Sequence, residues 1–132
     1  MNGTDEMQAH GIAMLLWSCD PARPDLLATP FFHAAAAAAL DTPVEIYFSA
    51  ASVELLRPGV AAALHASPAQ PKTIYDTMRE AAGHGAVFLA CSDALASHGL
   101  DHATLIPECT RRGGAVQFMA RAADLRWRTL VF

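Results

Sequence analysis

The chain has 132 residues, enough for one domain that buries a core without help from disulfides or a metal. Apolar residues make up 53% of it and charged residues only 17%, which favours a subunit that covers part of its surface with copies of itself. The formal net charge is -4 and Lys72 is the one lysine, so a nucleic-acid partner is not expected, because phosphates are bound mainly through Lys and Arg.

The N-terminal residues 1–10 contain acids and no Lys or Arg, and the apolar run after them is short. This pattern is typical of neither a signal peptide nor a transmembrane span. We therefore expect residues 1–10 to be a flexible lead-in, residues 11–132 to form a single domain, and no membrane partner.

The cysteines favour a cytoplasmic protein. Cys19, Cys91 and Cys109 form no CxxC pair and show no zinc-site spacing, and their odd number argues against a disulfide framework. Free thiols persist in a reducing cytoplasm, and we expect the protein there.

The first part of the domain predicts two strands around an alanine-rich helix. Residues 11–18, GIAMLLWS, form a continuous apolar run, as in a strand that is buried on both faces. Thr29 is the predicted N-cap of the next helix, with Pro30 at its first position and a run of alanines behind it. Residues 44–50 are rich in β-branched and aromatic side chains and predict the second strand.

The middle of the chain predicts further helices and a third strand. Residues 52–66 have a helical pattern that a Pro-Gly pair interrupts. Thr73 is a predicted N-cap, and its helix should end at the first or second of the glycines that follow. Residues 86–91, AVFLAC, predict a buried strand, and residues 92–99 predict a short helix.

The last part of the chain completes an alternation of strands and helices. Residues 101–114 are expected to be an irregular or helical connection, residues 115–125 a strand that continues into a helix, and residues 128–132 the closing strand. This alternation favours a parallel sheet with helices on both faces. The predicted fold is therefore α/β, a flavodoxin-like three-layer sandwich with a mostly parallel five-stranded sheet in the order 2-1-3-4-5.

Two cysteines follow strands of that predicted sheet. In open parallel sheets, ligands collect beyond the carboxyl ends of the strands where the order reverses, and the predicted order makes strands one and three neighbours there. Cys19 follows strand one and Cys91 closes strand three. The amides at the start of the next helix would favour the Cys91 thiolate, whereas the carboxylate of Asp93 would disfavour it. On these residues alone, a packed and inert Cys91 is the commoner outcome.

Four stretches of the chain resemble the DsrE-like family of sulfur-relay proteins. They are IAMLLWS, ATPFFHAAAAAALDTPVEIYFSAASVELLRPGV, AVFLACSDALASHGL and WRTLVF, and the similarity extends over residues 11–132. The resemblance implies a flavodoxin-like fold and assembly as a homotrimer or hexamer. It also implies that the cysteine after the third strand carries sulfane sulfur as a persulfide between donor and acceptor proteins, and the matching position is Cys91.

Two functions stay open from the sequence. The first is a sulfur carrier or sulfurtransferase-like protein that takes up and passes on sulfur at Cys91, with Asp20, Ser92 and Asp93 as auxiliary candidates. Cys19 would then resolve the persulfide as a second thiol, or it is a loop thiol without a role. The alternative is a non-catalytic oligomeric binding or scaffold subunit in which Cys91 is silent.

No cofactor and no metal is expected. The loop SCDPARPD after the first strand has no glycine, and no GxGxxG or Walker A string occurs, which disfavours a nucleotide- or flavin-binding module. The histidines show no HxH or HExxH spacing, so no zinc site is predicted. Cys109 has no predicted role, and Arg111 and Arg112 are a solvated pair or a shallow anion contact.

Overall fold

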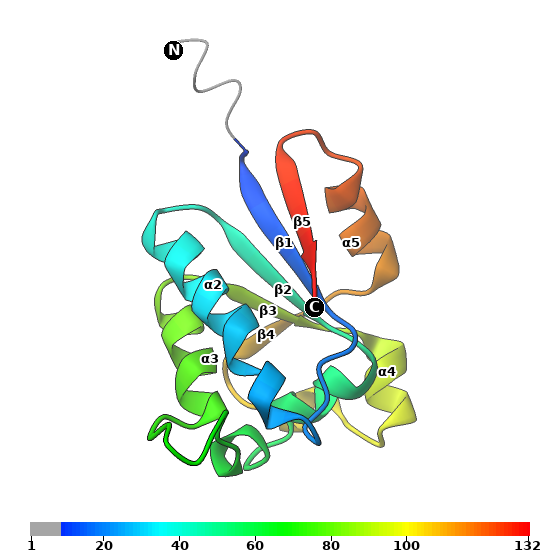
Figure 1. The fold of residues 1–132 in the computed structure, drawn as a ribbon. Coiled ribbons are helices and arrows are strands. Elements are labelled where there is room, and N and C mark those ends of the chain that lie inside the picture. The colour runs from blue at the N-terminus through cyan, green and yellow to red at the C-terminus, as the bar shows by residue number, and fades with distance from the viewer. Residues whose placement is uncertain (1–8) are drawn as a thin grey trace.

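The computed structural model describes residues 9–132, so residues 1–8 of the predicted lead-in lie outside the described residues. The described chain forms one five-stranded sheet whose paired strands are all parallel (Figure 1). The strands are β1 (Gly11–Leu16), β2 (Val44–Phe48), β3 (Val87–Ala90), β4 (Cys109–Arg112) and β5 (Trp127–Val131). The α-helices are α2 (Ala28–Ala39), α3 (Ile74–Gly83), α4 (Ser92–Ser97) and α5 (Ala115–Ala122). The connections contain the short 3-10 helices η1 (Pro24–Leu26), η2 (Ala50–Leu56), η3 (Ala61–Ala63) and η4 (His102–Thr104).

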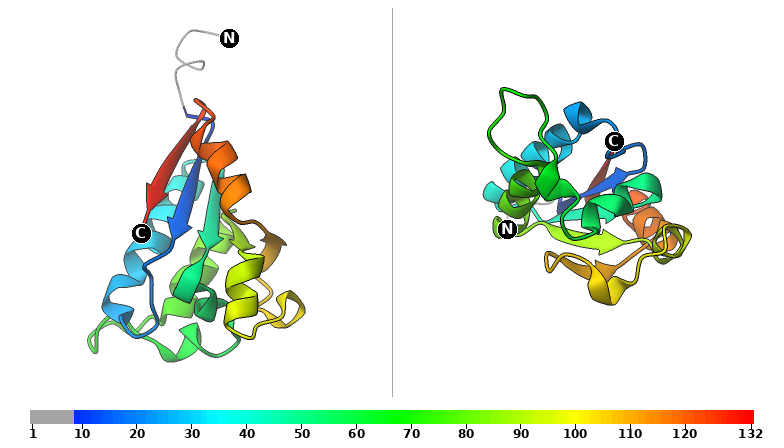
Figure 2. Two further views of the ribbon diagram at one scale, coloured as in Figure 1. Left: turned by 90° about the vertical axis from the view of Figure 1, so that its right-hand side faces the viewer. Right: turned by 90° about the horizontal axis from the view of Figure 1, so that it is seen from below.

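Helices cover both faces of the sheet, as predicted. The helices α2 and α3 pack side by side on one face, and α5 lies on the opposite face (Figures 1 and 2). The larger core lies under α2 and α3 and includes Phe48 and Phe88. A smaller core under α5 joins Tyr47 and Leu89 of the sheet to Phe118 of the helix. The predicted α/β class with a parallel sheet is therefore confirmed.

Across the described residues, no helix has both the length and the apolar character that crossing a bilayer requires.

The predicted strand order is wrong. The sheet has the order β4-β3-β2-β1-β5, so β2 separates β1 from β3, and the order reverses at β1. Every residue of β2 is buried, which requires a neighbouring strand on each edge and cover on each face. The edge position that the predicted order gave to β2 would leave one side of this strand unpaired.

The fourth strand is also not where the sequence predicted it. Residues 115–125 do not begin with a strand, because the helix α5 starts at the first of them. Phe118 and Arg121, three residues apart, face the sheet, whereas Val116 is 88% exposed. The strand β4 lies instead within the predicted connection 101–114. Only Cys109, the first residue of β4, is buried, and the other three residues of the sequence CTRR are exposed and polar. The strand therefore lacks the apolar pattern by which strands are predicted.

One predicted helix cap is confirmed and another is wrong. The hydroxyl oxygen of Thr73 accepts a hydrogen bond from the N–H of Asp76 at 3.0 Å, and the Asp76 carboxylate accepts one from the N–H of Thr73 at 2.9 Å. This capping box starts α3 as predicted. Thr29 is not a cap, because η1 leads directly into α2 and the N-cap is Leu27.

The predicted helix within residues 52–66 forms as the 3-10 helix η2 instead. The buried hydroxyl of Ser52 donates to the carbonyl of Leu16 at 2.6 Å, and its oxygen accepts from the N–H of Ser49 at 2.9 Å. These contacts fix the connection after β2 against the end of β1. They therefore shape the carboxyl edge of the sheet.

Candidate functional site

Cys91 lies at the carboxyl edge of the sheet, directly after β3 and before α4. Its N–H donates to the carbonyl of Phe48 at the end of β2 at 3.0 Å, and its carbonyl accepts from the N–H of Leu95 at 3.0 Å. Its backbone is therefore held between a sheet strand and a helix. Cys91 is half-buried, so part of this residue faces water.

Cys91 lines a pocket of about 250 Å³, which we call the Cys91 pocket. The pocket is built at the carboxyl ends of neighbouring parallel strands and beside the start of α5. Its lining residues are Leu15, Tyr47, Ser49, Cys91, Gly113, Gly114, Ala115, Phe118 and Met119. The lining is mainly apolar, and Cys91 contributes its one sulfur nucleophile.

Two glycines let the loop between β4 and α5 pass close to this sulfur. A Cβ atom at Gly113 would lie 2.8 Å from Leu89 Cδ2 and 3.2 Å from Tyr47 Cε1, so a side chain there would displace its neighbours. A Cβ atom at Gly114 would lie 3.8 Å from Cys91 Sγ, an ordinary contact distance. Gly113 is thus required for the close approach of the loop, and Gly114 forms the wall beside the sulfur.

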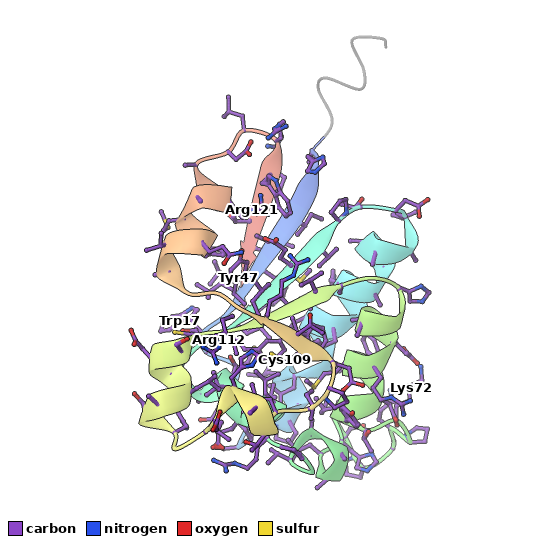
Figure 3. All side chains as sticks on the ribbon, turned by 180° about the vertical axis from the view of Figure 1, so that it is seen from behind. Trp17, Tyr47, Lys72, Cys109, Arg112 and Arg121 are labelled. Atoms are coloured by element: carbon purple, nitrogen blue, oxygen red, sulfur yellow. The ribbon has the colours of Figure 1, made fainter. Side chains whose placement is uncertain are left out.

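An ion pair between buried Glu45 and half-buried Arg121 joins α5 to the sheet beside the Cys91 pocket. Glu45 is 5% exposed, and Arg121 donates to both of its carboxylate oxygens at 2.9 Å. The hydroxyl of Tyr47 also donates to Glu45, at 2.8 Å. The guanidinium of Arg121 lies 4.0 Å from the centroid of the Trp127 ring, a cation–π contact. Figure 3 shows Arg121 and Tyr47 on the face of the sheet that α5 covers.

These contacts set the charge states of the network. Burial alone would raise the pKa of the Glu45 carboxyl, but the hydrogen bonds from Arg121 and Tyr47 outweigh burial and hold this pKa below its usual value. Burial and the hydrogen bond to Glu45 raise the pKa of Tyr47, which therefore stays a neutral donor. Sequence patterns do not predict this network, because Glu45 and Arg121 are 76 residues apart. The one local signal is an acid inside the apolar strand pattern VEIYF.

The other two cysteines lie outside the Cys91 pocket. Cys19 and Cys109 are buried in the larger core, on the side of α2 and α3. Burial raises the pKa of the Cys19 thiol, and it raises the pKa of Cys109 to about 11. The strands that precede Cys19 and Cys91 are not neighbours, contrary to the prediction, because β2 lies between them. Cys19 is thus a core side chain in this structure.

The auxiliary candidates also lie outside the lining of the pocket. Asp20 is exposed, and its carboxylate accepts a hydrogen bond from the N–H of Ala22 at 2.9 Å, as in a local turn. Ser92 and Asp93 are exposed in the first turn of α4. Within residues 9–132 no amide of this turn donates to the sulfur of Cys91, so the predicted support for a thiolate is not present as a direct hydrogen bond.

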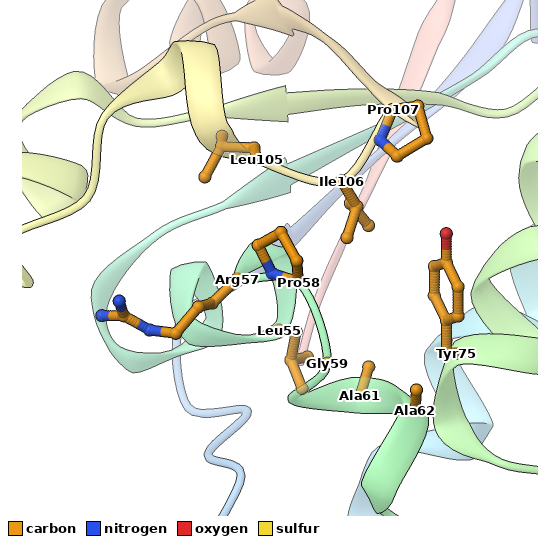
Figure 4. Close-up of a pocket in the computed structure, with 10 residues that line it drawn as sticks. All are labelled: Leu55, Arg57, Pro58, Gly59, Ala61, Ala62, Tyr75, Leu105, Ile106 and Pro107. Atoms are coloured by element: carbon orange, nitrogen blue, oxygen red, sulfur yellow. The ribbon is translucent and has the colours of Figure 1, made fainter.

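A second cavity, of about 190 Å³, lies between η2, η3 and α3 (Figure 4). Its polar side chains are bound within the protein: Arg57 donates to Glu54 at 2.8 Å, and the hydroxyl of Tyr75 donates to Glu108 at 2.7 Å. It contains none of the residues that the sequence predicted for a site. Over the described part of the chain, no three His, Cys, Asp or Glu side chains gather where they could hold a metal ion.

Comparison with known proteins identifies a fold. No family model matches this chain, and no curated protein matches it. A solved structure does: the protein of unknown function MTH1491 from Methanobacterium thermoautotrophicum has a TM-score of 0.65 to this chain, over 93% of this chain and 99% of that one. The two chains share a fold. Their sequence identity is 19%, so the similarity to MTH1491 shows the fold alone.

Proposed function

We propose that this protein carries sulfane sulfur as a persulfide on Cys91. The observation that carries the proposal is the setting of Cys91, a half-buried residue that lines a pocket of about 250 Å³ at the carboxyl edge of a parallel sheet. The resemblance to the DsrE-like family supports the same residue. Cys19 and Cys109 are poorer candidates, because both are buried and both have a raised thiol pKa.

The transfer needs no cofactor and no oxidant. The thiolate of Cys91 attacks the outer sulfur of a donor persulfide, R–S–SH, so that a new S–S bond forms and the donor S–S bond breaks. The leaving R–S⁻ takes up a proton from water. An acceptor thiolate then removes the outer sulfur from Cys91–S–SH by the same displacement, and Cys91 returns to its thiolate.

The alternative function is an oligomeric binding or scaffold subunit in which Cys91 is silent. Large apolar side chains that are exposed favour this alternative: Trp17, Phe32, Val116, Met119, Leu125, Leu130 and Val131. Such surfaces commonly mark contacts between subunits. A homotrimer or hexamer, as the family resemblance implies, is compatible with either function, so the oligomeric state does not distinguish them.

We expect reduced protein that is incubated with inorganic polysulfide to gain roughly 32 Da, the mass of one sulfur. Peptide mapping should locate this sulfur on Cys91, and dithiothreitol should remove it. The Cys91→Ser variant should lose the mass gain, whereas Cys19→Ala, which removes a buried thiol outside the pocket, should retain it. If the protein gains no sulfur, or gains it on Cys19 or Cys109, the sulfur-carrier function of Cys91 is wrong and only the scaffold function stands.

A further inference from the structure

The Cys91 pocket has an uncharged lining. Among its nine described lining residues there is no Asp, Glu, Lys, Arg or His. Leu15, Phe118 and Met119 contribute apolar side chains from β1 and α5. Tyr47 presents its ring, because its hydroxyl donates to Glu45. The sulfur of Cys91 therefore borders a mainly apolar space.

The charged side chains of the surrounding elements lie outside the lining of the pocket. Arg111 of β4 lies opposite Leu89 in the sheet register, and its charge contributes to the lowered pKa of Glu45. The guanidinium of Arg121 is occupied by both oxygens of Glu45 and by the ring of Trp127. Arg112, at the end of β4, lines a different cavity. An anion that enters the Cys91 pocket would lose water and meet no cation in the lining, which costs free energy. An uncharged apolar group would instead gain free energy from its burial.

The size of the pocket limits the group that it accepts. A cavity of about 150 Å³ is sufficient to take up benzene in an engineered protein core. The volume of about 250 Å³ therefore leaves room for one ring-sized group together with the sulfur atoms that react.

We propose that the sulfur donor for Cys91 is a small, uncharged organic persulfide, R–S–SH, whose apolar group R is the size of one ring. The proposal rests on the proposed function and specifies its substrate class. In the transfer step the group R occupies the pocket while Cys91–S⁻ takes the outer sulfur; R–S⁻ then leaves and is protonated by water. Donors that carry carboxylates next to their sulfur are disfavoured by the same lining.

The test uses two aromatic disulfides that differ in charge. Dithiodipyridine is neutral and dithiobis(nitrobenzoate) carries two carboxylates, and each modifies a thiolate by displacement, Cys–S⁻ + R–S–S–R → Cys–S–S–R + R–S⁻. The reaction rate with the neutral reagent is divided by the rate with the anionic reagent, for Cys91 and for N-acetylcysteine amide. The small thiol is the reference and corrects for the intrinsic reactivity of the two reagents. We expect the ratio on Cys91 to exceed the reference ratio by at least about tenfold. The Cys91→Ser variant gives the background from the buried cysteines.

Two lysine variants separate the pocket from the net charge of the protein. Met119→Lys places a cation at the lining of the pocket and should raise the rate with the anionic reagent by about fivefold, with little change for the neutral one. Val116→Lys adds the same charge on the same exposed face of α5, but outside the lining, and should change either rate by less than about twofold.

Three results would overturn the assignment of an uncharged donor. The first is a neutral-to-anionic rate ratio on Cys91 that is at or below the ratio on N-acetylcysteine amide. The others are no reaction of Cys91 with either reagent, and equal effects of the two lysine variants. The polysulfide experiment tests the proposed function separately, because it is read as an end point at excess reagent, where a lining that slows an anion does not prevent the transfer. If Cys91 forms a persulfide but shows no preference for the neutral reagent, the sulfur-carrier function stands and this donor class is wrong. If Cys91 prefers the neutral reagent but forms no persulfide, the sulfur-carrier function is wrong instead.

Discussion

Replacement of Arg121 by Met is expected to destabilise the protein by about 3 kcal/mol at neutral pH. The variant keeps an unbranched apolar side chain but removes the cation that binds both oxygens of Glu45. Glu45 is 5% exposed, and Tyr47 would be its remaining side-chain partner. An ionised carboxylate that is buried without a cation is strongly unfavourable, and urea unfolding should measure the loss.

The pH dependence of this loss identifies its cause. In the wild-type protein the Glu45 carboxyl has a lowered pKa, so its contribution to stability is present above the unfolded pKa and is lost as the pH falls through the folded pKa. Without Arg121, burial raises the pKa of Glu45, and the variant becomes more stable on acidification from neutral pH as this carboxyl takes up a proton. The difference in stability between the two proteins should therefore shrink between about pH 7 and pH 4.

A second arginine variant is the control, because it also removes an ion pair but one that lies on the surface. Arg126 pairs with Asp124 at 3.3 Å on the surface, and Arg126→Met should change the free energy of unfolding by less than about 1 kcal/mol. A loss for Arg121→Met that does not vary with pH would contradict the charge argument. The contact with Trp127 would then account for the stability.

Gly113→Ala should cost about 2 kcal/mol, whereas Gly114→Ala, which replaces the N-cap glycine of α5, should lower the free energy of unfolding by less than about 1 kcal/mol. The new methyl group at position 113 would lie 2.8 Å from Leu89 and 3.2 Å from Tyr47, which are 0% and 1% exposed, so these buried side chains would have to shift. At position 114 the methyl group reaches Cys91 Sγ at an ordinary contact distance of 3.8 Å.

The second glycine variant should instead act on the chemistry of the pocket. Because the methyl group at position 114 narrows the space beside the sulfur, we expect slower alkylation of Cys91 by iodoacetamide than in the wild-type protein. Urea unfolding and the alkylation rate together check both variants. Equal destabilisation by the two substitutions, or an unchanged alkylation rate in Gly114→Ala, would show that the loop does not pass beside Cys91 as described.

Features that depend on neighbouring residues in the chain could be predicted from the sequence. The N-cap at Thr73 was predicted, because a cap depends on neighbouring residues: Thr73 and Asp76, which exchange the capping hydrogen bonds, are three positions apart. The end of the apolar run AVFLAC also indicated that Cys91 follows a buried strand, and the structure has β3 there. Parallel pairing with helices on both faces followed from the alternation of the elements.

Long-range packing determines the features that the sequence did not predict. The run AVQF resembles a strand, but Phe118 needs the sheet beneath it and Val116 faces water, which only a helix provides. The edge strand β4 has a polar sequence because most of it is exposed. With β4 and α5 misassigned, neither the Gly114 wall of the pocket nor the pairing of Arg121 with Glu45 was predictable.

Alkylation of the native protein tests most directly whether the sulfur of Cys91 is open at the edge of the sheet. Iodoacetamide at about pH 8, followed by peptide mapping with and without urea, gives the rate at each cysteine. We expect Cys91 to react in the folded protein while Cys19 and Cys109 react only after unfolding, since both are buried. If Cys91 is protected to the same extent as those two, the sulfur is closed to solvent and cannot act as a carrier.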